Sequence, residues 1–404
     1  MPLVRRPTGK APGLLARETE EEPVADRDYD LVLLGATGFT GGLTARELAT
    51  RLRDTTVRWA IAGRDRAKLE AVRDQLPADP DIEVVDVHDL VGLLDLAERT
   101  KVLATTVGPY AQHGELVVQA CVRAGTDYCD ITGEPGFVDL IRKRYDADAR
   151  RRRVRLVPCC GFDSVPHDLG VAYTVAQLPD DQPVEVRGYV HATGRFSGGT
   201  ANSALEAIAE RAMPDRVPPT STDGSRRVGL LPARIHRVDR LDAYGVPLPT
   251  IDPVIVLRSA RELPSYGPDF RYGHFAQVHR LPTVAAGVGG MAAFGALASL
   301  SPTRALLRRL LPASGEGPSQ ERRARSRFQV TFLGSGGGRR VVTRVSGGDP
   351  GYDETAKMLA EAALSLAQDP RGDAAGVCTP AVALGEPYRR RLEDRGIRFE
   401  TLED

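Results

Sequence analysis

Residues 29–42 read Tyr29-Asp-Leu-Val-Leu-Leu-Gly-Ala-Thr-Gly-Phe-Thr-Gly-Gly42, and the expected fold follows from their pattern. The run Leu31 to Leu34 is wholly apolar and stops at a glycine, as in a parallel strand that is buried on both faces. Beyond the glycines, Leu43, Leu48 and Leu52 recur at helical spacing. A strand, a glycine-rich turn and a helix in this order predict the first unit of a Rossmann-type, doubly wound parallel sheet.

Three glycines, Gly35, Gly38 and Gly41, follow the strand in a G-x-x-G-x-x-G spacing. We expect the first to permit a sharp turn, the second to let the backbone approach a pyrophosphate, and the third to let the helix pack closely on the strand. The pyrophosphate would lie at the helix N-terminus, where free N–H groups and the dipole favour an anion. The alternative is a glycine-rich turn that binds no ligand.

A second apolar run, Trp59 to Ala62, ends in Gly63 and Arg64. A NAD site usually has Asp or Glu at this position to bond the ribose 2′-hydroxyl, whereas a cation suits the 2′-phosphate of NADP. Arg66 and Lys68 follow closely and add positive charge. The sequence therefore predicts NADP(H) as the cofactor, and the alternative for Arg64 is an ordinary surface cation.

The composition bounds the class of protein. The chain has 404 residues, 54 Lys and Arg against 54 Asp and Glu, and five cysteines. This length suggests two or three domains, and zero net charge gives no electrostatic case for a nucleic-acid partner. The cysteines form no C-x-x-C pair, so neither a metal site nor a disulfide framework is expected. No signal peptide opens the sequence, which favours a reduced, cytosolic protein.

The chain divides into four expected segments. Residues 1–27 are rich in Pro, Arg and Glu and are expected to be a disordered leader. Residues 28–167 alternate strands with helices and are the expected NADP-binding Rossmann domain. Residues 168–348 lose that alternation, which predicts an α+β substrate domain, and residues 349–404 are expected to be helical.

Two features stand out in the expected second domain. Alternating strands on either side of Gly334 to Gly338 predict a hairpin. Residues 284–300 carry no charge and are followed by arginines. Three interpretations of this apolar segment stay open: a helix that lines a substrate channel, an interfacial anchor, and a bilayer span. A span is the least attractive, because it would put the hairpin across the membrane from the cofactor domain.

Short motifs in the first half of the chain carry a family resemblance. They are Gly35-Ala-Thr-Gly-Phe-Thr-Gly41, Gly63-Arg64, Thr105-Thr-Val-Gly-Pro-Tyr110, Gly125-Thr-Asp-Tyr-Cys-Asp130, Thr132-Gly-Glu134 and Cys160-Gly-Phe-Asp-Ser-Val-Pro166. Together they resemble the saccharopine dehydrogenase-like oxidoreductases, and within that group the trans-acting enoyl reductases of actinobacterial lipid synthesis. The resemblance runs from about Asp28 to His167, and it is weaker at Gly348 to Tyr352 and at Thr379-Pro380.

The resemblance implies a Rossmann domain that is interrupted by an α+β domain, with the C-terminal helices returning to the first domain. It also implies NADPH-dependent reduction, here of the carbon–carbon double bond of an enoyl lipid or polyketide intermediate. The apolar segment suits such a hydrophobic substrate. The alternatives are a saccharopine-type dehydrogenase or reductase of a small amino or keto acid, and a membrane-associated protein that binds NADP without turnover. The expected partners are a hydrophobic or acyl substrate, either free or carrier-bound, a peripheral membrane contact and a second copy of the chain.

The expected site residues lie where predicted strands end. Those expected to bind the cofactor are Gly35, Thr37, Gly38, Phe39, Thr40, Gly41, Gly63, Arg64, Thr106, Gly108 and Pro109. Tyr110, Asp163 and His167 are the catalytic candidates, the first as a hydrogen-bond donor and the other two as a proton relay. The alternative for Tyr110 is a ring stacked in the cofactor cleft. Asp163 could instead cap a helix that begins near Val165.

Overall fold

The computed structural model describes residues 27–193, 226–280, 282–283 and 317–403. The expected leader, apart from its last residue, lies outside the described residues, and so does the apolar segment 284–300.

The first sheet is a seven-stranded parallel sheet in the order β14-β6-β5-β4-β1-β2-β3. The strands of this sheet and the helices between them, as far as Val157, are β1 (Tyr29–Leu34), α1 (Phe39–Leu52), β2 (Trp59–Gly63), α2 (Arg66–Arg73), β3 (Asp81–Val84), α3 (Leu90–Glu98), β4 (Thr100–Thr105), α4 (Tyr110–His113), α5 (Glu115–Ala124), β5 (Asp127–Asp130), α6 (Pro135–Arg151) and β6 (Arg155–Val157). Leu31 to Leu34 are at most 1% exposed. The Rossmann-type sheet is thus confirmed.

Alternate residues of β1 enter different layers of the core, as the pleat of a strand requires. Leu31 and Leu33 pack with Leu48 of α1, whereas Val32 and Leu34 pack with Leu93 of α3. Helices therefore cover both faces of the first sheet, which explains why the strand has no polar alternation.

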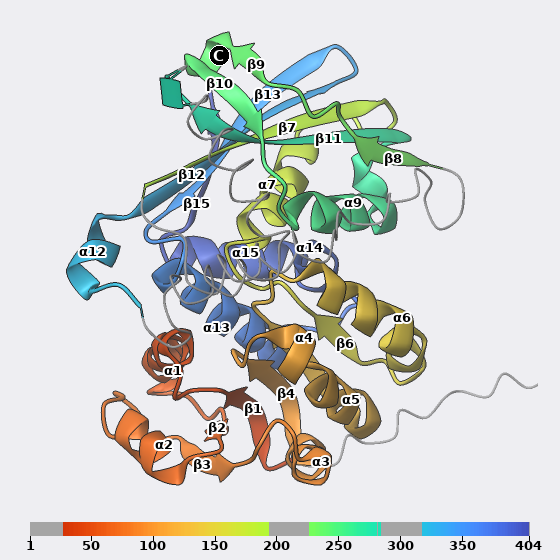
Figure 1. The fold of residues 1–404 in the computed structure, drawn as a ribbon. Coiled ribbons are helices and arrows are strands. Elements are labelled where there is room, and N and C mark those ends of the chain that lie inside the picture. The colour runs from red at the N-terminus through yellow and green to blue at the C-terminus, as the bar shows by residue number, and fades with distance from the viewer. Residues whose placement is uncertain (1–26, 194–225, 281, 284–316, 404) are drawn as a thin grey trace, which may run out of the picture.

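The second sheet contains both parallel and antiparallel strand pairs and lies above the first in Figure 1. Its elements are α7 (Val165–Val175), β7 (Val184–Thr193), β8 (Arg227–Leu230), β9 (His236–Val238), η1 (Asp239–Leu241), β10 (Ala243–Pro247), α9 (Asp252–Glu262), η2 (Pro264–Tyr266), β11 (Asp269–Val278), α12 (Gln320–Arg325), β12 (Arg327–Gly336) and β13 (Arg339–Gly347). β12 and β13 form the predicted hairpin, turning through Gly337 and Gly338, which both have positive φ. α7 and α9 pack on this sheet.

The C-terminal segment returns to the first sheet and also reaches the second. It contains α13 (Asp353–Gln368), β14 (Gly376–Val377), α14 (Pro380–Ala383), α15 (Gly385–Asp394) and β15 (Arg398–Leu402). α13 packs on α1, β4 and β5, and Figure 1 shows α13 and α15 between the two sheets. β14 extends the first sheet beside β6, and β15 pairs with β13 of the second. The segment is therefore not purely helical, and the domain boundaries stay a prediction.

Among the described residues, no helix is long and apolar enough to cross a bilayer.

Candidate cofactor and active site

Two glycines at the junction of β1 and α1, Gly35 and Gly41, have no room for a side chain. Gly35 has a φ of +93°, in the region that favours glycine. A Cβ atom on Gly41 would lie 2.0 Å from the carbonyl oxygen of Gly35. The structure thus agrees with the turn expected at Gly35 and the close helix packing expected at Gly41.

Gly38 differs from both, because the space around it is open. Among the residues that the structure describes, a Cβ atom at Gly38 would meet only the Gly35 oxygen, at 3.4 Å, and the Gly38 φ of −78° is ordinary. Gly38 is the N-cap residue of α1, and both it and Thr37 are exposed. The first turn of α1 has no acidic residue and no side-chain cap, so its N–H groups and the helix dipole are available to an anion.

Phe39, the first residue of α1, ties this turn to later parts of the chain. Its ring is 5.0 Å from that of Tyr352, edge to face. The Arg323 guanidinium lies 5.2 Å from the centre of the Phe39 ring and is paired with Asp353. Phe39 therefore holds the C-terminal segment against the glycine turn, and the neighbouring Thr40 is partly exposed.

Arg64 follows β2 directly after Gly63 and is exposed. It makes no hydrogen bond or ion pair with any residue that the structure describes. Nearby, the rings of His88 and His113 are 5.0 Å apart. Burial lowers the pKa of His113, and the charges of His88 and Arg64 lower it further. A positively charged side chain at the end of β2 that no described residue pairs with suits a 2′-phosphate.

The loop after β4, which contains Gly108 and Pro109, lies against the glycine turn. Thr106 donates a hydrogen bond from its hydroxyl to the Gly35 oxygen, at 3.1 Å. At the end of this loop, the buried carboxylate of Glu134 accepts the N–H groups of Tyr110 at 2.9 Å and of Ala111 at 2.8 Å. The Thr132-Gly-Glu134 motif therefore holds the start of α4 in place.

The Tyr110 side chain is buried near the carboxyl ends of β4 and β5. Its hydroxyl donates to the Thr105 oxygen at 3.2 Å and accepts from the Ile131 N–H at 3.4 Å. Its ring packs on Phe137 at 5.7 Å, and burial raises the pKa of the hydroxyl well above its usual value. In this structure the hydroxyl is bonded to the backbone, so a role as substrate donor would require that contact to break.

Asp163 and His167 take up different environments. Asp163 is partly exposed and lies beside Gly133, where an added Cβ would be 3.3 Å from its Oδ2. Ser164, not Asp163, is the N-cap residue of α7. His167 is 2% exposed, and its Nε2 lies 3.4 Å from Oδ1 of Asp252. The acidic partner of His167 is thus Asp252, from a distant part of the sequence, and not the predicted Asp163.

A third residue, His274, completes this buried group. Its ring is 4.9 Å from that of His167, and its Nε2 lies 3.4 Å from Oδ2 of Asp252. Burial lowers the pKa of His167 to about 4, and the carboxylate of Asp252 opposes that shift only in part. We call His167, Asp252 and His274 the His–Asp–His cluster.

Comparison with known proteins identifies the family. A trans-acting enoyl reductase of Mycobacterium ulcerans is 33% identical over 92% of this chain and 97% of its own length. One from Mycobacterium tuberculosis is 32% identical over 93% and 98%. Another M. tuberculosis protein, provisionally given the same name, is 36% identical with the same coverage.

The chain belongs to the trans-acting enoyl reductase family.

Two further comparisons agree with this family assignment. Residues 31–153 match the saccharopine dehydrogenase NADP-binding domain, so the cofactor is NADP(H). The solved structure of saccharopine dehydrogenase from Saccharomyces cerevisiae superposes with a TM-score of 0.53 at 13% identity, over 92% of this chain and 99% of that one. At this identity the structure supports the shared fold alone.

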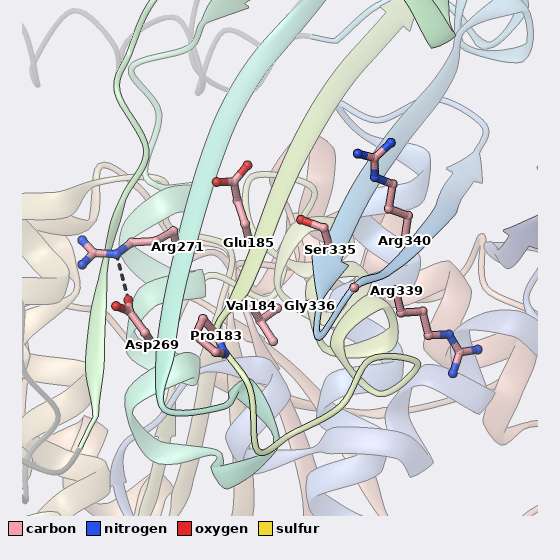
Figure 2. A pocket seen from close by; sticks show the side chains of 10 residues that line it. Pro183, Val184, Glu185, Asp269, Arg271, Ser335, Gly336, Arg339 and Arg340 are labelled. Carbon is pink, nitrogen blue, oxygen red and sulfur yellow. Dashed lines mark hydrogen bonds and ion pairs between the residues drawn. The ribbon is translucent and has the colours of Figure 1, made fainter.

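Two features of this family member could not be expected from its sequence. Asp252 and His274 belong to no motif, since Asp252 precedes a proline at a helix start and His274 lies inside strand β11. The second feature is a pocket of about 420 Å³ at the ends of β7, β11 and the β12–β13 hairpin. Figure 2 shows it lined by charged side chains, with Arg271 paired to Asp269 at 2.9 Å. It contains none of the predicted site residues.

Proposed function

We propose that this protein uses NADPH to reduce the carbon–carbon double bond of an enoyl chain that another protein carries. The observation that supports the proposal is the open turn at Gly38, before a helix start without a side-chain cap, in a chain that matches trans-acting enoyl reductases over 93% of its length. The roles of the cofactor-binding and catalytic residues are part of this proposal.

The residues present fit NADP(H). The N–H groups at the start of α1 would hold the pyrophosphate, and Arg64 would hold the 2′-phosphate. Gly108 and Pro109, in the loop after β4, lie at the carboxyl edge of the sheet, where ligands of open α/β sheets bind.

When bound, NADPH supplies the hydride that adds to one carbon of the double bond. The protein must then provide hydrogen-bond donors for the enolate oxygen and a proton for the other carbon. Of Tyr110, Asp163 and His167, only Asp163 is not buried. We therefore propose Asp163 as the first candidate for proton handling. Asp163→Asn should lower kcat while leaving the KM for NADPH unchanged.

The experiment that tests the proposal measures NADPH oxidation with enoyl thioesters, free and carrier-bound, and with keto and imino acids. We expect oxidation with the enoyl thioesters. Oxidation only with keto or imino acids would support the saccharopine-type alternative. NADPH binding without turnover on any substrate would support a non-catalytic protein. Gly38→Val is the control, because it should abolish the signal in a folded protein.

The finer expectations on partners rest on the sequence alone. We propose that segment 284–300 contacts the acyl chain or a membrane surface, that the protein is cytosolic, and that two copies associate. Ala293→Asp should reduce kcat/KM for long-chain substrates more than for short ones, because binding energy from a remote chain assists the reacting centre. Sedimentation with liposomes and sedimentation velocity test membrane contact and association.

A further inference from the structure

The His–Asp–His cluster joins three elements that are distant in the sequence. His167 is on α7, the helix that follows β6 of the first sheet. Asp252 is the first residue of α9, and His274 is on β11. One ligand-type atom from each side chain lies within 4.8 Å of the other two. All three residues are at most 6% exposed.

The cluster leaves polar atoms without partners. Nδ1 of His167, Oδ1 of Asp252 and Nε2 of His274 are inaccessible to solvent, and none of them has a hydrogen-bond partner among the residues that the structure describes. Asp252 lies 3.4 Å from Nε2 of each imidazole, which is close enough for attraction. The contact with His167 is made by its Nε2, so Nδ1 of that ring gains no partner from it. Buried polar atoms are nearly always satisfied in native proteins, so three orphaned atoms in one group point to a missing partner.

The outer atoms of two of these side chains are held by neighbours. The Thr250 hydroxyl donates to Oδ2 of Asp252, and the Tyr272 hydroxyl bonds Nδ1 of His274 at 3.1 Å. These bonds leave Oδ1 of Asp252 and Nε2 of His274 for the interior of the cluster. Metal-ligating histidines and carboxylates typically have such supporting hydrogen bonds on their other atoms.

We infer that the His–Asp–His cluster binds one divalent transition-metal ion, with Zn²⁺ as the best fit. Two imidazoles and one carboxylate suit zinc, whereas Mg²⁺ and Ca²⁺ prefer oxygen ligands throughout. A water molecule completes a tetrahedral shell. The sequence shows no zinc spacing, because the three ligands meet only in the tertiary structure.

The position of the site indicates a structural role. The ion connects α7 to α9 and β11, and thereby the carboxyl edge of the first sheet to the second sheet. The ligands are too deeply buried for a substrate to reach. Loss of the ion should therefore loosen the junction between the sheets and leave NADPH binding by the first sheet largely intact.

The test measures zinc in the purified full-length protein by elemental analysis and native mass spectrometry, before and after chelation. We expect about one zinc per chain and a lower melting temperature after chelation. Replacement by Co²⁺ should produce the visible absorption of a tetrahedral site. A protein that retains no zinc when purified with added Zn²⁺, and whose melting temperature does not respond to a chelator, would overturn the proposal.

Three variants locate the ion. Asp252→Asn conserves volume and should abolish zinc retention and the response to chelation, while NADPH titration shows that the first sheet is folded. Thr250→Ala removes only the supporting bond and should weaken affinity about tenfold or more. His279→Ala is the matched control, since His279 is an exposed histidine just beyond β11 with its ring 5.7 Å from that of His191. Zinc lost in His279→Ala but kept in Asp252→Asn would place the ion at His279 and His191 and overturn the proposal.

Discussion

At the scale of single residues, Gly38 and Gly41 belong to one spacing but have opposite surroundings. Gly38 has open space where a side chain would be, whereas a Cβ at Gly41 would overlap the Gly35 oxygen. Gly38→Val should therefore fold and lose NADPH binding, and Gly41→Ala should lose stability, because backbone atoms must move. Circular dichroism, thermal melts and NADPH titration separate the two. Normal NADPH binding by Gly38→Val would contradict the placement of the pyrophosphate.

Arg64 is the residue on which the choice between NADPH and NADH is expected to depend. Arg64→Asp should weaken NADPH binding about tenfold or more, since it removes a charge-assisted bond to the 2′-phosphate. NADH binding should improve relative to NADPH, because a carboxylate suits a free 2′-hydroxyl. Titration of both cofactors measures the effect. Equal weakening of the two would show that Arg64 is an ordinary surface cation.

Asp130 gives the protein a pH-dependent stability. Burial raises its pKa from 3.8 to about 6, although the Tyr128 hydroxyl and the N–H groups of Thr132 and Cys159 oppose the shift by bonding the carboxylate. A raised pKa means that the folded state holds the proton more tightly than the unfolded state. The contribution of Asp130 to the free energy of unfolding is thus full below about pH 4 and is lost as the pH rises through about 6.

The variant Asp130→Asn tests whether the stabilising contribution of Asp130 is lost as the pH rises. Its amide can replace the neutral acid, so it should match the parent near pH 4 and exceed it by about 3 kcal/mol near pH 7. Urea unfolding across this range, with parent and variant side by side, measures the difference. A constant difference at every pH would mean that Asp130 does not titrate as described.

At the scale of elements, α1, α13 and α15 meet at one buried carboxylate. Glu361 on α13 is 1% exposed and lies 2.7 Å from Arg51 of α1, 3.7 Å from Arg391 of α15 and 3.8 Å from Arg395. Burial raises the pKa of Glu361, and the surrounding arginines oppose this. The first helix of the Rossmann unit is therefore tied to the end of the chain by charge.

Glu361→Gln should lower the free energy of unfolding by about 2 kcal/mol, because three guanidinium groups lose their buried counter-charge. This value is below that for a fully buried pair, since the arginines are partly exposed. Glu386→Gln on α15 is the matched control. Its carboxylate is also paired with arginines but is half exposed, so the change should be below about 1 kcal/mol. Equal losses in the two would remove the role assigned to burial.

At the scale of the whole molecule, the C-terminal segment completes both sheets. α13 covers one face of the first sheet, β14 extends that sheet, and β15 pairs with the second. A fragment of residues 1–193 should therefore expose the apolar side of β1 and β4, bind hydrophobic dyes and aggregate. Solubility, dye binding and thermal melts of the fragment measure this. A soluble fragment with a cooperative melt and NADPH binding would show that the first sheet folds without the C-terminal segment.

The sequence alone predicted the parts of this protein that follow from local physics. A buried parallel strand must be apolar throughout, and a turn with positive φ followed by a closely packed helix requires glycine at set positions. The Rossmann unit, its NADP(H) cofactor and the β12–β13 hairpin were therefore predictable from neighbouring residues, and short motifs carried the family.

Contacts between residues that are distant in the sequence could be learned from the folded structure but not from local patterns. Hydrophobic periodicity shows that a strand has a buried face but not which strand it pairs with, so the two-residue β14 and the edge strand β15 were not predicted. For the same reason the sequence suggests a proton relay of His167 with nearby Asp163, whereas the fold places His167 beside Asp252 and His274. Tyr110 begins a helix of only four residues, which is too short for a periodic pattern to orient it, and its ring packs on Phe137 while its hydroxyl bonds the backbone.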